Sequence, residues 1–179
     1  MSAASIIREK IRTIPDFPKP GILFRDITTL LRDAEGFQLV IQEFERRLAG
    51  KPVDLVAGIE SRGFILAGAL AAALGKGFIP IRKPGKLPGR TIAETYQLEY
   101  GTDTLHVHSD AVEPGANVVL VDDLVATGGT MLAACRLLER LGGRITDLLF
   151  IVDLPDLGGR RQIEAKNYPT FWITDFAGH

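Results

Sequence analysis

The segment VVLVDDLVATGGT, residues 118–130, holds the densest group of residues that could do chemistry. An apolar run typical of a buried strand ends at two adjacent carboxylates, Asp122 and Asp123. A turn of small residues then opens a helix, so backbone N–H groups converge at the positive end of a helix dipole. This turn is predicted to cradle a phosphate through Ala126, Thr127, Gly128, Gly129 and Thr130.

The two carboxylates lie too far upstream to touch that same phosphate. One sugar unit away, Asp122 and Asp123 would accept hydrogen bonds from vicinal hydroxyls or hold hydrated Mg²⁺. An Asp-Asp pair at a strand end and a turn of small residues are each common without any function. Their combination predicts a site for a phosphorylated sugar. The chain contains no GxxxxGK[ST] loop and no GxGxxG after a strand, which argues against ATP and dinucleotide folds.

A second segment, Glu60-Ser61-Arg62-Gly63, also follows an apolar run and opens a helix. Its backbone amides, the Ser61 hydroxyl and the Arg62 guanidinium would be directed at one place, where a pyrophosphate fits. GIESRG half-resembles the elbow of serine hydrolases, but GxSxG requires glycine where Ile59 stands. We therefore reject an esterase.

The stretch RKPGKLPGRTIA, residues 82–93, is basic and rich in glycine and proline. Arg82, Lys83, Lys86 and Arg90 share one sign with no balancing acid. An ordinary solvated loop is the alternative, but this composition predicts a mobile lid that closes over an anion and excludes water.

The elements that position these segments alternate between strand and helix. We expect helices over residues 6–14, 36–48, 64–74 and 131–141, and strands over 54–60, 77–82, 117–123, 147–154 and 171–174. Residues 94–101 and 104–110 alternate apolar and polar side chains, which predicts an antiparallel ribbon. The alternation predicts an α/β fold with a largely parallel sheet and a ligand site beyond the strand C-termini.

Composition narrows the function classes. The 179 residues suit one domain, and a net charge of −1 provides no global attraction to nucleic acid or anionic lipid. The longest apolar stretch, residues 64–74, is shorter than the ~20 residues that a bilayer crossing needs. The single cysteine, Cys135, falls on an apolar helix face, and His106 and His108 lack a third metal ligand. We expect a cytoplasmic protein without a protein-caged metal and without membrane or nucleic-acid partners.

Residues 118–130 resemble the phosphoribosyl pyrophosphate (PRPP) signature of type I phosphoribosyltransferases. The flanking segments FPKPGILFRDIT, GIESRGF, RKPGKLPG and LEYG are similar to members that act on adenine, and the similarity covers nearly the whole chain. The resemblance implies a single domain over residues 1–179: a mostly parallel sheet flanked by helices, an antiparallel lid ribbon and a small hood. The hood would comprise residues 1–35 and the C-terminal segment.

The resemblance also implies an activity in purine salvage: transfer of the 5-phosphoribosyl group from PRPP to N9 of adenine, giving AMP and pyrophosphate. Asp122 and Asp123 would hold the ribose hydroxyls, and Glu99 would manage the adenine proton. Arg62 and Lys83 would act on the departing pyrophosphate. The remaining implied contacts are Glu60, Ser61, Arg82, Lys86 and Tyr100 for pyrophosphate, with a cis Glu60–Ser61 bond, and Leu23, Phe24, Arg25 and Leu157 for adenine.

Family members further imply Mg²⁺ bound with PRPP, and a homodimer. Two alternatives stay open. A relative specific for xanthine or guanine would share the sugar half of the site, and ILFRDI and LEYG are what favour adenine. A PRPP-sensing regulator would carry a helix-turn-helix or a large basic face, which a chain of net charge −1 does not offer.

Overall fold

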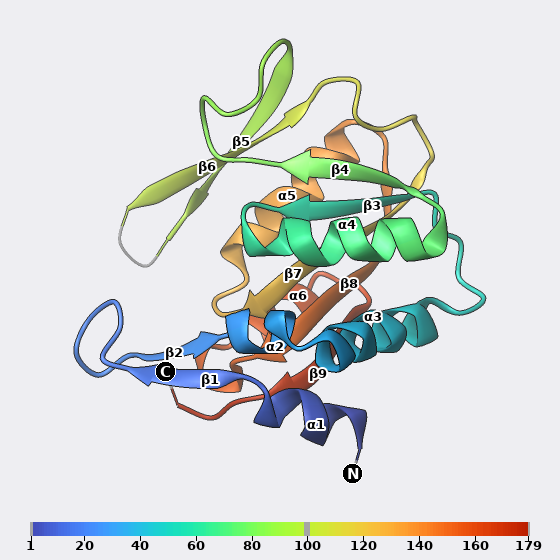
Figure 1. The fold of residues 1–179 in the computed structure, drawn as a ribbon. Helices are drawn as coiled ribbons and strands as arrows, with labels where there is room; N and C mark the ends of the chain where they lie inside the picture. Colours follow the sequence, from blue (N-terminus) through green and yellow to red (C-terminus); the bar gives the residue numbers. More distant parts are fainter. Residues whose placement is uncertain (1, 99–100, 179) are drawn as a thin grey trace.

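A five-stranded parallel sheet forms the centre of the computed structural model, which describes residues 2–98 and 101–178 (Figure 1). The strand order is β4-β3-β7-β8-β9, and every neighbouring pair is parallel. Parallel pairing brings the carboxyl ends of all strands to one edge of the sheet. The strands are β3 (Leu55–Ile59), β4 (Gly77–Ile81), β7 (Asn117–Val125), β8 (Arg144–Asp153) and β9 (Thr170–Asp175).

Helices cover both faces of this sheet. Alternate residues of β7 enter opposite cores: Val118 and Leu120 face one cluster, Val119 and Val121 the other. Such burial on both faces explains the unbroken apolar run that precedes the carboxylates. One face carries α1 (Ala3–Glu9), α2 (Thr28–Arg32), α3 (Ala34–Leu48) and α4 (Arg62–Leu74); the other carries α5 (Gly129–Arg140) and α6 (Gly159–Glu164), which follows a 3₁₀ turn, η1 (Pro155–Leu157).

Two antiparallel ribbons flank the carboxyl edge of the sheet. The first pairs β1 (Arg12–Pro15) with β2 (Leu23–Asp26), and the second pairs β5 (Thr91–Gln97) with β6 (Thr102–His108). Figure 1 shows both ribbons on the side toward which β3, β4 and β7 point. A bridge between Arg82 and His106 ties the second ribbon to the end of β4.

The predicted fold class is confirmed, as are the five main strands and the helices at residues 36–48 and 64–74. The lone cysteine, Cys135, is buried on α5 as expected. Within the described residues, no helix has both the length and the apolar character that a bilayer crossing requires.

The N-terminal prediction is wrong beyond Glu9, where α1 ends. Ile14 continues the helical spacing of Ile7 and Ile11, yet it lies in β1 and pairs with Phe24 of β2. Long-range strand pairing therefore overrides a local periodicity, and the short helix α2 was not predicted at all.

The antiparallel pairing of the predicted lid ribbon is confirmed, but its boundaries differ from the prediction. β5 begins at Thr91, inside the segment expected to be loop, and ends at Gln97, while β6 begins at Thr102. The turn occurs near Gly101, whose φ of +89° suits glycine and which accepts a hydrogen bond from the Leu98 N–H at 2.9 Å. The connecting loop of the predicted lid is thus limited to residues 82–90.

Candidate active site

The predicted phosphate loop lies where β7 passes into α5. Gly128 has a φ of +85°, and a Cβ there would lie 2.9 Å from the Gly159 carbonyl oxygen. Only glycine fits this turn. Gly128, the N-cap residue of α5, has no side chain that could cap the first turn, so the helix start can offer its N–H groups to a ligand. A cavity of about 120 Å³ opens here, lined by Asp122, Ala126, Thr127, Gly128 and Thr130 among others.

The second predicted loop leaves β3, the strand beside β7, and enters α4 at Arg62. The Glu60–Ser61 peptide bond is cis, which confirms that detail of the family resemblance. Ser61, the N-cap residue of α4, makes no capping hydrogen bond with its side chain. A cavity of about 250 Å³ lies over this loop and is lined by Glu60, Ser61, Arg62, Asp122 and Asp123.

Asp122 lines both cavities and therefore stands between them. Burial and the neighbouring Asp123 charge raise the pKa of Asp122 well above its ordinary value. The Arg62 Nε donates to the Asp123 carboxylate at 2.5 Å, and only 5% of the Asp123 side chain is exposed. If a ligand had one anionic group in each cavity, its central part would lie against the carboxyl groups of Asp122 and Asp123. Of these two, Asp123 is paired with Arg62.

Glu60 holds the base of the predicted lid. Its carboxylate accepts hydrogen bonds from Arg82 Nη2 at 3.3 Å, from Lys86 Nζ at 3.1 Å and from the Lys83 backbone N–H. Burial alone would raise the pKa of Glu60, but these hydrogen bonds lower it overall. The carboxylate therefore keeps its charge and gathers three predicted pyrophosphate residues at the mouth of the second cavity.

The Lys83 ammonium points instead toward the lid ribbon. It donates to Tyr96 Oη at 3.2 Å and to the Asp103 carboxylate. Tyr96 Oη also accepts a hydrogen bond from Thr130 of the phosphate loop at 3.2 Å. Sequence reasoning missed Tyr96 and Asp103, because on an alternating ribbon they have no feature that separates them from ordinary packing and surface residues.

Phe24, a predicted adenine contact on β2, lies close to Arg62 of the second loop. Its ring contacts Phe17 edge-on at a centroid distance of 5.1 Å, and the Arg62 guanidinium lies 5.4 Å from the Phe24 centroid. Leu23 and Phe24 are both half-buried. Phe24 therefore lies beside the second loop. This position is the one expected for a ring that stacks on a base bound next to the pyrophosphate.

Arg25 is buried on the opposite side of β2, because successive strand residues alternate between faces. Its guanidinium donates to Thr13 Oγ1 at 2.7 Å and to the Ala177 carbonyl at 2.8 Å, and it lies 4.7 Å from the Phe176 ring centroid. The structure thus joins the Arg25 side chain to the C-terminal segment and does not bring it together with Phe24.

Leu157 lies in η1 and packs, partly buried, against the core on the α3 and α4 face. The Gly159 N–H, just beyond it, donates to the Ala126 carbonyl at 2.9 Å, which joins this segment to the phosphate loop. The predicted catalytic residue Glu99 and the predicted pyrophosphate contact Tyr100 lie outside the described residues.

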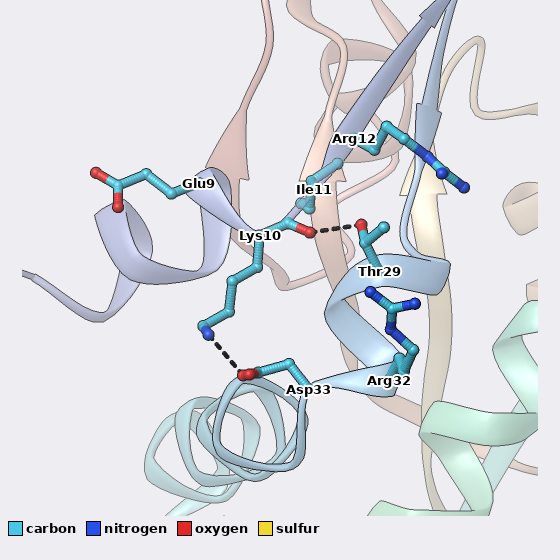
Figure 2. Close-up of a pocket in the computed structure, with 7 residues that line it drawn as sticks. All are labelled: Glu9, Lys10, Ile11, Arg12, Thr29, Arg32 and Asp33. Carbon is cyan, nitrogen blue, oxygen red and sulfur yellow. Dashed lines mark hydrogen bonds and ion pairs between the residues drawn. The ribbon is translucent and has the colours of Figure 1, made fainter.

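A separate hollow of about 420 Å³ lies between the end of α1, β1 and the α2–α3 junction (Figure 2). Its charged groups are largely paired: Lys10 Nζ lies 2.6 Å from the Asp33 carboxylate, and Arg12 pairs with Asp26. Thr29 donates to the Lys10 carbonyl at 2.6 Å. None of the predicted site residues that the structure describes lines this hollow, whose contacts join the first ribbon to α3.

The profile of the phosphoribosyl transferase domain matches residues 33–176. An adenine phosphoribosyltransferase of Prosthecochloris aestuarii is 56% identical over 174 residues, which cover 96% of this chain and 98% of that protein. The chain belongs to the phosphoribosyltransferase family, in its adenine phosphoribosyltransferase branch.

Solved members of this branch share the fold. The adenine phosphoribosyltransferase of Thermoanaerobacter pseudethanolicus superposes with a TM-score of 0.93 at 47% identity, covering 97% of this chain and 99% of that one. The Saccharomyces cerevisiae enzyme, solved with an imino-altritol bisphosphate and adenine, has a TM-score of 0.89 at 38% identity, covering 96% and 98%. The family resemblance predicted from the signature segment is thereby confirmed.

Proposed function

We propose that this chain transfers the 5-phosphoribosyl group of PRPP to N9 of adenine, giving AMP and pyrophosphate in purine salvage. The observation that carries the proposal is the position of Asp122 between two cavities that each end at an uncapped helix start. PRPP has a phosphate at one end, a pyrophosphate at the other and a ribose between them. The relatives named adenine phosphoribosyltransferase support adenine as the acceptor.

In this proposal the 5′-phosphate binds the N–H groups of the loop from Ala126 to Thr130, and the ribose hydroxyls donate to Asp122 and Asp123. Arg62 holds Asp123, whereas Asp122 Oδ1 accepts a hydrogen bond from the Asp123 backbone N–H at 2.9 Å. Vicinal ribose hydroxyls would supply further donors to both carboxyl groups.

The pyrophosphate would bind at Ser61 and Arg62, with Arg82, Lys83 and Lys86 arriving from the lid base. The C1′–O bond to pyrophosphate breaks ahead of formation of the N9–C1′ bond, through an oxocarbenium-like state. Positive groups fixed around the leaving oxygens stabilise the charge that develops there. Adenine loses its N9 proton, and Glu99 is the proposed acceptor.

Phe24 would stack on one face of adenine and Leu157 would cover the other, while the Leu23 and Arg25 backbone reads the base edge. The hood formed by residues 1–35 and the C-terminal segment supplies this half. The guanidinium of Arg25 supports the hood through Thr13 and Ala177, so it serves the base indirectly.

Mg²⁺ would enter with PRPP. The described residues contain no group of three or more His, Cys, Asp or Glu side chains arranged to cage an ion, whereas two adjacent carboxyl groups suit an ion held mainly by phosphate oxygens and water. Asp122 and Asp123 would face its water shell. When bound, the ion would neutralise part of the negative charge on the leaving group.

A homodimer belongs to the same proposal. Ile65 of α4 and Phe78 of β4 are 47% and 38% exposed, and Phe78 contacts Phe64 with ring centroids 5.5 Å apart. This apolar edge suits a second copy of the chain, and sedimentation of the purified protein should give twice the chain mass. A cytoplasmic location suits the buried free thiol of Cys135.

One assay tests the proposed reaction. The purified chain is incubated with PRPP and Mg²⁺ together with adenine, hypoxanthine, guanine or xanthine, and the nucleotides are separated by chromatography. We expect AMP from adenine and no comparable product from the other bases. Turnover of guanine or xanthine instead would reassign the base, and PRPP binding without any nucleotide product would indicate a sensor.

A further inference from the structure

The hydroxyl of Tyr96 lies where three elements meet. Tyr96 belongs to β5, is 5% exposed, and its ring packs in the core cluster that includes Leu105 and Met131. A Cβ on Gly129, at the start of α5, would lie 3.5 Å from Tyr96 Cδ2. The ribbon thus presses directly on the helix start that forms the phosphate loop.

Every hydrogen-bonding position of this hydroxyl is occupied. Tyr96 Oη accepts from Lys83 Nζ and from Thr130 Oγ1, both at 3.2 Å, and donates to Asp103 Oδ2 at 3.3 Å. A phenol has one proton and two acceptor sites, so this arrangement uses all of them. One oxygen atom therefore joins the lid base, the lid ribbon and the phosphate loop.

The same contacts determine the state of Lys83. Burial alone would lower the pKa of its ammonium, but the hydrogen bonds to Asp103 and Tyr96 raise it overall. Lys83 consequently keeps its positive charge, and the Tyr96 hydroxyl links its ammonium group to the Thr130 hydroxyl.

We propose that Tyr96 is a positioning residue that holds the Lys83 ammonium at a fixed separation from the phosphate loop, so that both ends of PRPP find their partners in place. This inference rests on the proposed function. A lysine has a long flexible stem, and fixing its charge before the ligand binds reduces the entropy lost on binding. The aromatic ring fills the core, whereas the hydroxyl positions Lys83 together with Asp103, and it alone joins this pair to Thr130.

The decisive variant is Tyr96→Phe, which keeps the ring and removes only the oxygen. We expect the KM for PRPP to rise about tenfold, the cost of a lost hydrogen bond to a charged group, with the KM for adenine changed by less than about twofold. The melting temperature should stay within about 2 °C of the wild type, because the packing is retained.

Thr95→Val is the matched control. Thr95 neighbours Tyr96 on β5, and its hydroxyl forms a hydrogen bond with the Thr104 hydroxyl across the ribbon at 3.0 Å, in an exposed pair. This variant also removes one ribbon hydroxyl, yet both KM values should match those of the wild type.

A second arm asks whether Tyr96 acts through Lys83. In a Lys83→Met background, adding Tyr96→Phe should change the KM for PRPP by less than about twofold, because the two residues share one interaction.

An unchanged PRPP KM in Tyr96→Phe would overturn the proposal, as would a tenfold effect that persists undiminished without Lys83. Failure of the proposed reaction appears separately, as a wild type that makes no AMP; calorimetric PRPP binding by the same variants then decides the role of Tyr96.

Discussion

The loops proposed to bind the phosphates and the segments proposed to bind the base, named here the phosphate half and the base half, are built in different ways. In the phosphate half, β3 and β7 lie side by side in the core, and each runs directly into a binding loop and a helix. The base half is assembled from β2, the 3₁₀ turn η1 and the C-terminal segment, joined by side chains such as Arg25 and Asp156. Backbone geometry dominates the first half, and long-range side-chain contacts dominate the second.

This difference indicates where each half is sensitive. Small changes to the backbone of the phosphate half should abolish function, because its N–H groups cannot move independently of the core strands. The base half should tolerate more, since its partners are held by separate contacts. Arg62 is shared, as it holds Asp123 and lies against Phe24.

Gly159→Ala should have the largest effect. A Cβ at this position would lie 2.2 Å from the Ala126 carbonyl oxygen and 2.7 Å from the Gly128 nitrogen, so the phosphate loop must shift. A displacement near 1 Å lowers rates about a hundredfold, and we expect at least that loss in kcat/KM for PRPP. The control is Gly158→Ala, where a Cβ meets nothing within 4 Å and only the φ of +73° is unfavourable. Equal activity in both variants would contradict a rigid phosphate loop.

Arg62→Lys comes next and tests the link between the halves. Lysine keeps the charge but loses the planar group that holds Asp123 at 2.5 Å and covers Phe24. We expect kcat/KM for PRPP to fall roughly thirtyfold, or about 2 kcal/mol, and the KM for adenine to rise as well. Steady-state kinetics with each substrate varied in turn measures both effects. A change confined to PRPP would mean that the halves are not coupled through this residue.

Phe24→Ala should affect the base half alone. Stacking of a base on an aromatic ring contributes about 1–3 kcal/mol, so the KM for adenine should rise roughly tenfold or more while the KM for PRPP is retained. Phe17→Leu is the control, since Phe17 packs against Phe24 in a T-shaped arrangement and is 51% exposed. An unchanged adenine KM in Phe24→Ala would show that the ring only packs within the hood.

The same difference explains what could be predicted from the sequence. The phosphate half follows from contiguous strand-turn-helix segments, so residues 60–63 and 118–130 suffice to place both loops and their carboxylates at one sheet edge. The base half depends on pairings that no local pattern reveals. Ile14 has helical spacing but pairs in a ribbon, and Arg25, expected at the base edge, points to Ala177, 152 positions away. The partners of Lys83 could not be predicted for the same reason, because Tyr96 and Asp103 reach it through the fold of the lid ribbon.

Arg25→Met distinguishes a structural from a direct role for that side chain. Because the guanidinium joins β1, β2 and the C-terminal segment, its loss should lower the melting temperature by about 2–6 °C, for roughly 1–2 kcal/mol of stability. The KM for adenine should rise only a few-fold, as the hood loosens. A large rise in the adenine KM at an unchanged melting temperature would instead place the guanidinium on the base.

The smallest effect concerns acid stability of the hood, where Asp26 accepts hydrogen bonds from Arg12 and from Thr28. These bonds, that from the Arg12 side chain foremost, lower the pKa of Asp26 to about 2 from 3.8. A carboxylate whose pKa is lower in the folded protein than in the unfolded chain stabilises the fold at every pH above its unfolded-state pKa. It loses that contribution as the pH falls through its folded-state pKa. The melting temperatures of the wild type and Asp26→Asn should therefore differ by a constant amount above about pH 4 and converge towards pH 2.

Other carboxylates titrate in the same range, so the difference between the two curves is the quantity to measure. A difference that stays constant down to pH 2 would show that Asp26 stabilises the hood by packing rather than by its charge.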